Sequence, residues 1–260
     1  MSALPTRGDD PPLRPPGGLP PEPPAPDRRF APSDGEPPRQ ARDTADPDGG
    51  PPAWLRDLAV TAAQSPVPPL LQPPPDGGRP SAVLVLFGDG PDGPDLLLVQ
   101  RGPGLRRHSG QPAFPGGAVD PGDAGPVAAA LREAAEEAGV DPAGVEVLAV
   151  LPDLFIARSG FSVTPVLAWW RRPVPVAPAD PPEVTAVARV PLGELADPAR
   201  RLRIRHPSGL TGPAFRVRGM LVWGFTAALV DRLLTLGGWE QPWDHGRIEE
   251  LPPETFTAGS

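Results

Sequence analysis

A group of acidic side chains is the feature of this sequence that most directly indicates chemistry. Glu133, Glu136 and Glu137 lie in Pro126–Ala138, a segment that predicts a helix because proline stands in its first turn, alanine fills its middle and Gly139 follows its end. At about 100° per residue, the three carboxylates fall within about 100° of one another on the helix surface. The opposite side is expected to pack on the protein, through Leu131, Ala135, Ala138, Val127 and Ala128.

Three carboxylates on one face of a helix repel one another, and near the C-terminus the helix dipole disfavours them further. A hard divalent cation would turn this repulsion into a binding site, because Mg²⁺ prefers oxygen ligands and commonly shares them with substrate phosphates. The alternative is a solvated acidic surface, partly neutralised by an ion pair between Arg132 and Glu136 at i, i+4. Taken alone, the three glutamates favour the solvated surface.

The glutamates need a scaffold, which the apolar runs of the sequence provide. Two runs, Ser81–Gly88 and Asp95–Arg101, flank a turn rich in Asp, Gly and Pro and predict a hairpin or two neighbouring strands. Further strands are expected at Val145–Leu151, Phe161–Trp170 and Val184–Val190, and further helices at Ala53–Ala63 and Leu221–Leu236. Strands interspersed with helices predict an α/β domain, with helices on both faces of the sheet.

Proline is unevenly distributed along the chain. Of the 260 residues 45 are proline, and residues 1–52 combine many of them with few large apolar side chains, which predicts a disordered Pro-rich tail. The folded domain is expected to span residues 53–240. Residues 241–260 are expected to form an irregular C-terminal tail.

Charge and cysteine content exclude several classes of function. With a net charge of −8, the chain is not expected to bind nucleic acid or an anionic membrane through general electrostatics. The absence of cysteine excludes disulfides, thiolate metal sites and cysteine nucleophiles, and it fits a cytoplasmic location. No apolar run reaches the ~18 residues expected of a membrane-spanning helix. A small anionic substrate is compatible with these features if a metal ion or local arginines receive it.

The residues around the glutamates resemble the Nudix box. The family pattern is Gly-x5-Glu-x7-Arg-Glu-U-x-Glu-Glu-x-Gly-U, where U is a bulky aliphatic residue. Here Gly116, Gly117 and Asp123 precede Arg-Glu-x-x-Glu-Glu-x-Gly at Arg132–Gly139. Two departures concern the acidic residue of the loop: it is Asp123 rather than Glu, and eight residues rather than seven separate it from the arginine. A third is Ala134 at the first aliphatic position.

A second motif, upstream, resembles the signature of the Nudix proteins that hydrolyse coenzyme A, Leu-Leu-Thr-x-Arg-[Ser/Ala]-x3-Arg-x3-Gly-x3-Phe-Pro-Gly-Gly. This sequence has Leu97-Leu98-Val99-Gln100-Arg101-Gly102, then Arg106, Gly110 and Phe114-Pro115-Gly116-Gly117, with every spacing kept. Val99 replaces Thr, and Gly102 replaces Ser or Ala. That branch also commonly has the Asp and the extra residue in its box. Residues 53–236 are therefore similar to the coenzyme A pyrophosphatase branch.

The resemblance implies a Nudix-type α/β/α sandwich with a mixed sheet and a loop-helix-loop metal site, and it also implies an activity. Coenzyme A or a thioester of it would be cut at the diphosphate, giving 3′,5′-adenosine bisphosphate and 4′-phosphopantetheine. By the family pattern, Glu133, Glu136 and Glu137 would hold Mg²⁺ or Mn²⁺, and Glu133 or Glu136 would also act as the base. In some members a later glutamate is the base, and Glu183 is the candidate here.

The other motif residues would position the loop and the substrate. Arg132, a catalytic residue by this resemblance, would pair with a carboxylate of the box such as Asp123, or else with Glu136 alone. Arg101 and Arg106 would bind substrate phosphates, which suit the guanidinium fork. The signature also implies three substrate-binding glycines that allow close approach of the backbone or a tight turn, Gly110, Gly116 and Gly117.

Two other functions stay open on the sequence alone. One is a Nudix hydrolase for another nucleoside diphosphate such as ADP-ribose; the other is a non-catalytic Nudix-fold binding domain whose Pro-rich tail recruits a partner. Many members of the family act as dimers, so a homodimer is a further open alternative. Variable loops would recognise the acyl part of the substrate, and residues 158–160 and 200–212 are the candidates.

Overall fold

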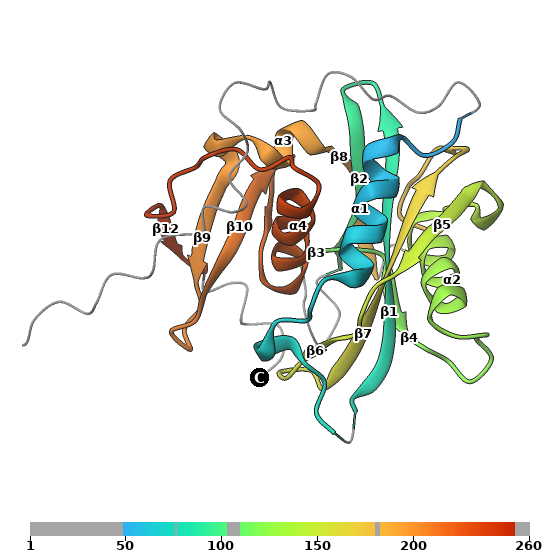
Figure 1. Ribbon diagram of the computed structural model, residues 1–260, viewed down its shortest axis with the longest axis horizontal. Helices are drawn as coiled ribbons and strands as arrows, with labels where there is room; N and C mark the ends of the chain where they lie inside the picture. The colour runs from blue at the N-terminus through green and yellow to red at the C-terminus, as the bar shows by residue number, and fades with distance from the viewer. Residues whose placement is uncertain (1–48, 76, 103–109, 180–182, 253–260) are drawn as a thin grey trace, which may run out of the picture. The chain divides into compact units, whose positions relative to one another are not determined.

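The computed structural model describes residues 49–75, 77–102, 110–179 and 183–252. At its centre is an eight-stranded sheet whose main path is β3-β2-β1-β7-β5, with β4 paired to β1, β6 to β7 and β8 to β2 (Figure 1). The strands are β1 Arg79–Gly90, β2 Gly93–Arg101, β3 Pro112–Ala113, β4 Gly116–Ala118, β5 Val145–Val150, β6 Leu154–Ile156, β7 Phe161–Trp170 and β8 Val184–Pro191. Residues 1–48 of the expected Pro-rich tail lie outside the described residues.

The sheet is mixed, because β1 and β7 run parallel while the other described pairs are antiparallel. The predicted hairpin is confirmed as β1 and β2, and the three later strands agree with prediction to within a residue at each end. Ala82 of β1 pairs with Gly117 of β4 on one side and with Thr164 of β7 on the other. Ala82 therefore lies at an inner position of the sheet, and the Gly-Gly pair lies beside it on β4, whose described pairing is with β1.

Helix α2 (Pro126–Ala138) covers one face of the sheet, at the predicted residues. Its buried residues are Ala129, Ala130, Ala134, Glu137 and Ala138. The expected packing side is thus confirmed in part: Ala138 is buried and Val127 and Leu131 pack against the core while partly buried, but Ala129, Ala130 and Ala134 carry most of the contact. Small alanines let the helix approach the sheet closely, and this rotates Glu137 into the interior.

Helices α1 (Ala53–Gln64) and α4 (Gly224–Leu236) belong to the apolar core on the opposite face, so the predicted α/β arrangement with helices on both faces is confirmed. Trp54 of α1 makes edge-to-face contacts with Phe87 of β1 and with Trp239, at centroid distances of 5.8 and 5.4 Å. Among the described residues, none of the helices combines the length and the apolar character needed to cross a membrane.

A second sheet, of four strands, departs from the expectations for the C-terminal part. Its order is β11-β10-β9-β12, with β9 Arg201–Arg205, β10 Thr211–Val217, β11 Met220–Val222 and β12 Ile248–Glu250. Helix α4 starts at Gly224 rather than Leu221, because the preceding residues form β11. Residues 200–212, expected to be a variable loop, contain β9 and the start of β10, and the expected irregular tail contains β12.

Strand β9 can be explained by the alternation of apolar and polar residues, although its three arginines make that alternation hard to recognise in the sequence. In β9 the apolar Leu202 and Ile204 are buried and alternate with the more exposed Arg203 and Arg205, which is the period of a half-buried strand, while Arg201 at its start is buried as well. The short strand β12 has no readable period and depends on pairing with β9. The remaining helical segments are short: α3 Leu192–Ala196, and the 3₁₀ turns η3 Pro69–Leu71, η4 Pro142–Gly144 and η5 Pro198–Arg200.

Candidate active site

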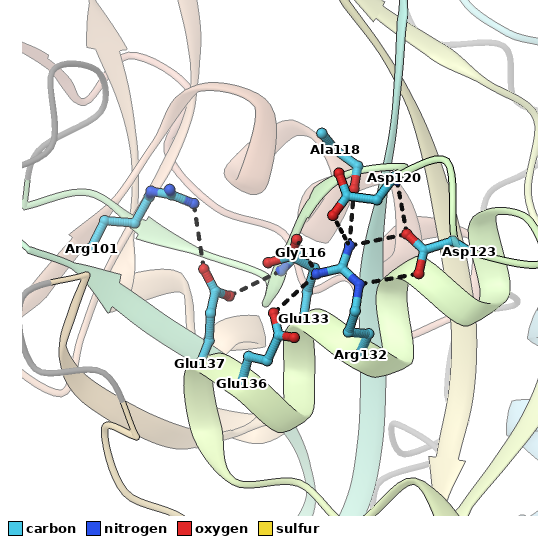
Figure 2. Close-up of polar contacts among 9 residues, drawn as sticks. All are labelled: Arg101, Gly116, Ala118, Asp120, Asp123, Arg132, Glu133, Glu136 and Glu137. Carbon is cyan, nitrogen blue, oxygen red and sulfur yellow. Dashed lines mark hydrogen bonds and ion pairs between the residues drawn. The ribbon is translucent and has the colours of Figure 1, made fainter.

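The three glutamates lie in the C-terminal half of α2, where strand β4 and the loop after it return to the helix (Figure 2). Gly139 ends the helix with a φ of 71°, and its N–H donates to the carbonyl of Ala135 at 3.0 Å. A left-handed glycine at this position is a common end of a helix. The glutamates therefore occupy the last two turns, which are fixed by the helix and its cap.

Glu137 is the most buried carboxylate of the group, with 3 % of the residue exposed. The backbone N–H of Gly116 donates to its Oε2 at 3.0 Å, and Arg101 Nη1 lies 3.6 Å from its Oε1 (Figure 2). Burial raises the pKa of Glu137 to about 7, an effect that the Gly116 N–H and Arg101 oppose and that Glu133 and Glu183 reinforce. A buried carboxylate held by two donors is typical of a functional site.

Both glycines of the Gly-Gly pair are required by close contacts. A Cβ at Gly116 would overlap the carbonyl oxygen of Ala82 and lie 2.7 Å from the Cα of Val83. A Cβ at Gly117 would lie 2.5 Å from Oε1 of Glu133. The pair thus lets strand β4 lie against β1 while the Glu133 carboxylate approaches its backbone.

Arg132 links the loop to the helix through several carboxylates at once. Its Nε and Nη2 donate to Oδ1 and Oδ2 of Asp123 at 3.1 and 3.0 Å, and its Nη1 donates to Glu133 and Glu136, both at 2.9 Å (Figure 2). Both pairings considered from the sequence are therefore present together. The hydrogen bond from Arg132 lowers the pKa of Asp123, and the paired carboxylates raise that of Arg132.

Glu133 and Glu136 differ in their surroundings. The side chain of Glu133 is 18 % exposed and that of Glu136 is 59 % exposed. Burial raises the pKa of Glu133, against the hydrogen bond and charge of Arg132. Glu133 is therefore the partly desolvated carboxylate beside the Gly-Gly backbone, whereas Glu136 faces water.

The carboxylates of α2 are suitable ligands for a hard divalent cation, although they do not surround a metal site by themselves. Within the part of the chain that the structure describes, no three side chains of His, Cys, Asp or Glu gather tightly enough to enclose a metal ion by themselves. Mg²⁺ commonly uses only one or two carboxylates and completes its shell with water and substrate phosphates. The carboxylates of Glu133, Glu136 and Glu137, all oxygen donors on one helix, fit that mode of binding.

The other predicted residues are distributed as follows. Arg101 ends β2 and faces Glu137, and Gly110, with a φ of 70°, donates its N–H to the carbonyl of Arg101 at 2.9 Å. Arg106 lies outside the described residues. Glu183 is exposed, and its carbonyl accepts from the Gly102 N–H at 2.6 Å, which places the end of β2 beside the start of β8.

Asp120 is a site residue that the sequence reading missed. Its Oδ2 lies 3.6 Å from Nη2 of Arg132, and its backbone N–H donates to Oδ2 of Asp123 at 2.9 Å. The run Asp120-Pro121-Gly122-Asp123 is a turn signal in which an Asp side chain binds nearby backbone, and this could have identified it. The turn directs the Asp123 carboxylate toward Arg132.

The fold and the site together define a class: an α/β protein with an acidic helix whose arginine anchors a glycine-containing loop. The NUDIX domain profile matches residues 78–209. Two relatives called "Uncharacterized Nudix hydrolase NudL" are 44% identical over 168 residues, from Klebsiella pneumoniae, and 42% identical over 162 residues, from Escherichia coli K12. Each match covers 60% of this chain and 81% of the relative.

Solved structures resemble the chain more distantly. A Nudix hydrolase of M. smegmatis, RenU, is 22% identical with a TM-score of 0.46, over 67% of this chain and 98% of that one. The NUDIX domain of Shewanella oneidensis NrtR, solved with ADP ribose, is 24% identical with a TM-score of 0.39, over 47% of this chain and 80% of that one.

The chain belongs to the Nudix family and is a Nudix hydrolase, a pyrophosphohydrolase. Nudix hydrolases generally use divalent metal ions such as Mg²⁺ or Mn²⁺. The resemblance found in the sequence is therefore confirmed at the level of the superfamily.

Proposed function

We propose that this Nudix hydrolase cleaves the diphosphate of coenzyme A or of its thioesters, giving 3′,5′-adenosine bisphosphate and 4′-phosphopantetheine or its acyl form. One observation carries the proposal: the upstream signature and the Nudix box meet at Glu137. Arg101 of the signature lies 3.6 Å from Oε1, and Gly116, which belongs to both motifs, donates to Oε2. The signature therefore contributes directly to the same site as the box.

Glu133, Glu136 and Glu137 are the residues that would hold Mg²⁺ or Mn²⁺. When bound, the ion supplies charge neutralisation at the diphosphate and acidifies an attacking water. Arg132 keeps two hydrogen bonds to Asp123, so the loop stays anchored when Glu133 and Glu136 turn toward a cation. Arg132 thus acts on the reaction by positioning the glutamates and the loop.

Glu133 is the stronger candidate for the general base. Its carboxylate is partly desolvated, and burial raises its pKa, which makes it a stronger base. Glu136 is the more exposed of the two carboxylates, with 59 % of its side chain accessible. Glu183, the alternative base from outside the box, is exposed and contributes to the pKa of Glu137 only through its charge.

Substrate phosphates would be received on the side of the site formed by the signature. The Arg101 side chain is 27 % exposed, so its guanidinium is accessible while it faces Glu137. By the signature, the backbone of Gly116 and Gly117 would also approach the substrate, although the space where their Cβ atoms would lie is filled by Ala82, Val83 and Glu133. Gly110 forms the turn that returns the chain to Arg101. We include Arg106 in this group on the signature alone.

Hydrolysis of coenzyme A with Mg²⁺ or Mn²⁺, with products separated by chromatography, tests the proposal. Wild type is compared with Glu137→Gln, which keeps the shape of the side chain and removes its charge, and with Glu146→Gln, an exposed control on β5. We expect adenosine bisphosphate from wild type and the control, and a loss of at least ~100-fold in Glu137→Gln. Cleavage of ADP-ribose but not coenzyme A would refute the substrate, and binding without any turnover would indicate a binding domain.

A further inference from the structure

Arg101, the last residue of β2, lies opposite an irregularity on each side of its strand. On the side of β3, the backbone N–H of Gly110 donates to the Arg101 carbonyl at 2.9 Å, and the Arg101 N–H donates to the carbonyl of Gln111 at 3.1 Å. Two consecutive residues therefore oppose one, and the first of them is a glycine with a φ of 70°. This arrangement is a G1 β-bulge.

The irregularity on the other side of Arg101 lies in β8. Gln100 of β2 pairs with Ala186 of β8. Arg101 pairs with Val184, which leaves Thr185 as an extra residue between the two pairs. The Thr185 hydroxyl donates to the carbonyl of Gln100 at 3.3 Å and so ties the extra residue to β2. A second β-bulge therefore meets β2 at the same residue as the first.

The two bulges coincide where β2 turns a side chain toward the acidic helix. A bulge bends its strand and increases the local twist, and a bulge beside an active site commonly re-aims a side chain. Leu97 and Val99 are buried against α2, and Arg101 continues their row on that face of the sheet. Its Nη1 lies 3.6 Å from Oε1 of Glu137 (Figure 2). The local twist thus acts on the side chain that faces Glu137.

The core does not need the bulge at Thr185. Val184 is fully buried in the apolar cluster under α2. Without Thr185, ordinary alternation from Ala186 would still place Val184 on the α2 face, opposite Arg101. The extra residue therefore changes the geometry of the strand end at Arg101 rather than the packing. Resting on the proposed function, in which Arg101 receives the substrate diphosphate, we infer that Gly110 and Thr185 are positioning residues that aim its guanidinium.

This role differs from the one that the signature implies for Gly110. A Cβ at Gly110 would meet no described atom within 4 Å, so its positive φ, rather than space for a ligand, is what requires glycine. Thr185 belongs to neither motif. It is identified by the pairing register of β2 and β8.

Deletion of Thr185 tests the bulge itself, because the other residues of β8 keep their partners. We expect kcat/KM for coenzyme A to fall about 10- to 100-fold, since a displacement of about 1 Å in an active site can cost ~100-fold. Crystal structures of wild type and the variant should show the distance from Arg101 Nη1 to Glu137 Oε1 lengthened from 3.6 Å. Thr185→Val, which loses only the hydroxyl, should cause the same change at smaller size and carries the test if the deletion does not fold. An unchanged distance or an unchanged kcat/KM would overturn the inference.

Substitutions at Gly110 test the first bulge. Gly110→Ala places a Cβ at a positive φ and should lower kcat/KM about tenfold, whereas Gly110→Asn should restore most of it, because asparagine tolerates this conformation. Gly219→Ala is the matched control: its φ is 76°, its surroundings are as open, and it lies in the turn between β10 and β11. It should lower Tm as much as Gly110→Ala does and leave kcat/KM unchanged. Equal losses of kcat/KM in the alanine and asparagine variants would contradict a role for this bulge.

A double-mutant cycle with Arg101→Gln separates positioning from stability. If the bulges act through Arg101, deletion of Thr185 should cause no further loss of kcat/KM in the Arg101→Gln protein. Equal losses in both backgrounds would show that the bulges do not act through Arg101.

The same measurements distinguish this inference from the proposed function. If wild type cleaves ADP-ribose but not coenzyme A, the proposed substrate is wrong, and the cycle measured with ADP-ribose still decides whether the bulges act through Arg101. If wild type cleaves neither, the two crystal structures decide whether Thr185 sets the position of the Arg101 guanidinium.

Discussion

Arg132 donates two parallel hydrogen bonds to Asp123, at 3.1 and 3.0 Å, and joins the loop before α2 to the helix itself. Asp123 is where the box departs from the Nudix pattern, both in residue type and in spacing. The shorter side chain and the additional loop residue compensate each other, because the paired geometry still forms. The same guanidinium contacts Glu133 and Glu136, so one cation orients the loop and two proposed metal ligands.

Removing this link should weaken metal binding without unfolding the protein. We expect Asp123→Asn to raise the Mn²⁺ concentration for half-maximal activity about 10- to 100-fold, as is typical when a residue that orients metal ligands is changed. Arg132→Gln should have a larger effect, since it also frees Glu133 and Glu136. Arg171→Gln, which removes an exposed arginine 3.9 Å from Glu146, is the control and should match wild type. A wild-type metal dependence in both site variants would show that the link has no role in the reaction.

The two glycines should respond differently to the same substitution. Gly116→Ala places its Cβ against the backbone of Ala82 and Val83, which cannot move away, and should destabilise the protein by about 1–3 kcal/mol. Gly117→Ala meets the end of the Glu133 side chain, which can rotate away, so activity should fall ~10-fold or more with little change in Tm. Gly122→Ala has open space around it and serves as the control. The reverse order of effects on Tm and activity would contradict the contacts described here.

Glu137 should make the metal-free protein less stable as pH rises. Its pKa is about 7 in the folded protein against an ordinary value of 4.5, so folding favours the protonated form. Its contribution to stability is complete below pH 4.5 and is lost as pH rises through about 7. In EDTA, the Tm of wild type should therefore fall relative to that of Glu137→Gln between pH 5 and about 8.

Bound metal should oppose the fall in Tm with rising pH, because a cation and a proton compete for the carboxylate of Glu137. The rise in Tm caused by Mn²⁺ should grow with pH through about 7 in wild type and should be small and flat in Glu137→Gln. Glu146→Gln should behave like wild type in both series. A constant difference between wild type and Glu137→Gln across the whole pH range would show that Glu137 does not titrate there.

The second sheet should depend on the buried Arg201. Only 1% of this residue is exposed, and its guanidinium pairs with Asp231 of α4, reaches Glu240 at 3.5 Å and lies over the ring of Trp243 at 4.6 Å. Arg201→Met removes the partner of Asp231, so we expect a loss of about 3 kcal/mol in the free energy of unfolding. Denaturant unfolding measures it, with Arg203→Met as the control from the same strand.

Adding Asp231→Asn to Arg201→Met should restore part of that stability, since no unpaired charge is then left. Burial raises the pKa of Asp231 and Arg201 opposes the effect, which agrees with a carboxylate that relies on its partner. Additive losses in the double variant would indicate that packing of Arg201, rather than the ion pair, stabilises α4 on the sheet.

Local patterns were sufficient to predict the elements that have strong periodicity or clear ends. Helix α2 lies at its predicted residues because proline and glycine mark its ends, and β7 does so because ten residues, almost all apolar, form a strand that is buried on both faces. Strand β12 and the start of α4 were not predictable, because three-residue strands are determined by the partners with which they pair. The same limit applies to the buried side of α2, whose centre at Ala129, Ala130 and Ala134 was not predicted.

The sequence by itself determined that Glu133, Glu136 and Glu137 share a helix next to a Gly-Gly loop, because helix geometry and spacing are local properties. Only the tertiary structure decided that Glu137 is buried against Gly116 and Arg101, and that Arg158 and His206 meet. These pairs are far apart in the chain, and their distances depend on how β1 pairs with β4 and β7 and on how the second sheet packs. The charge of a residue can be read from its type, but its burial and its partner depend on the whole fold.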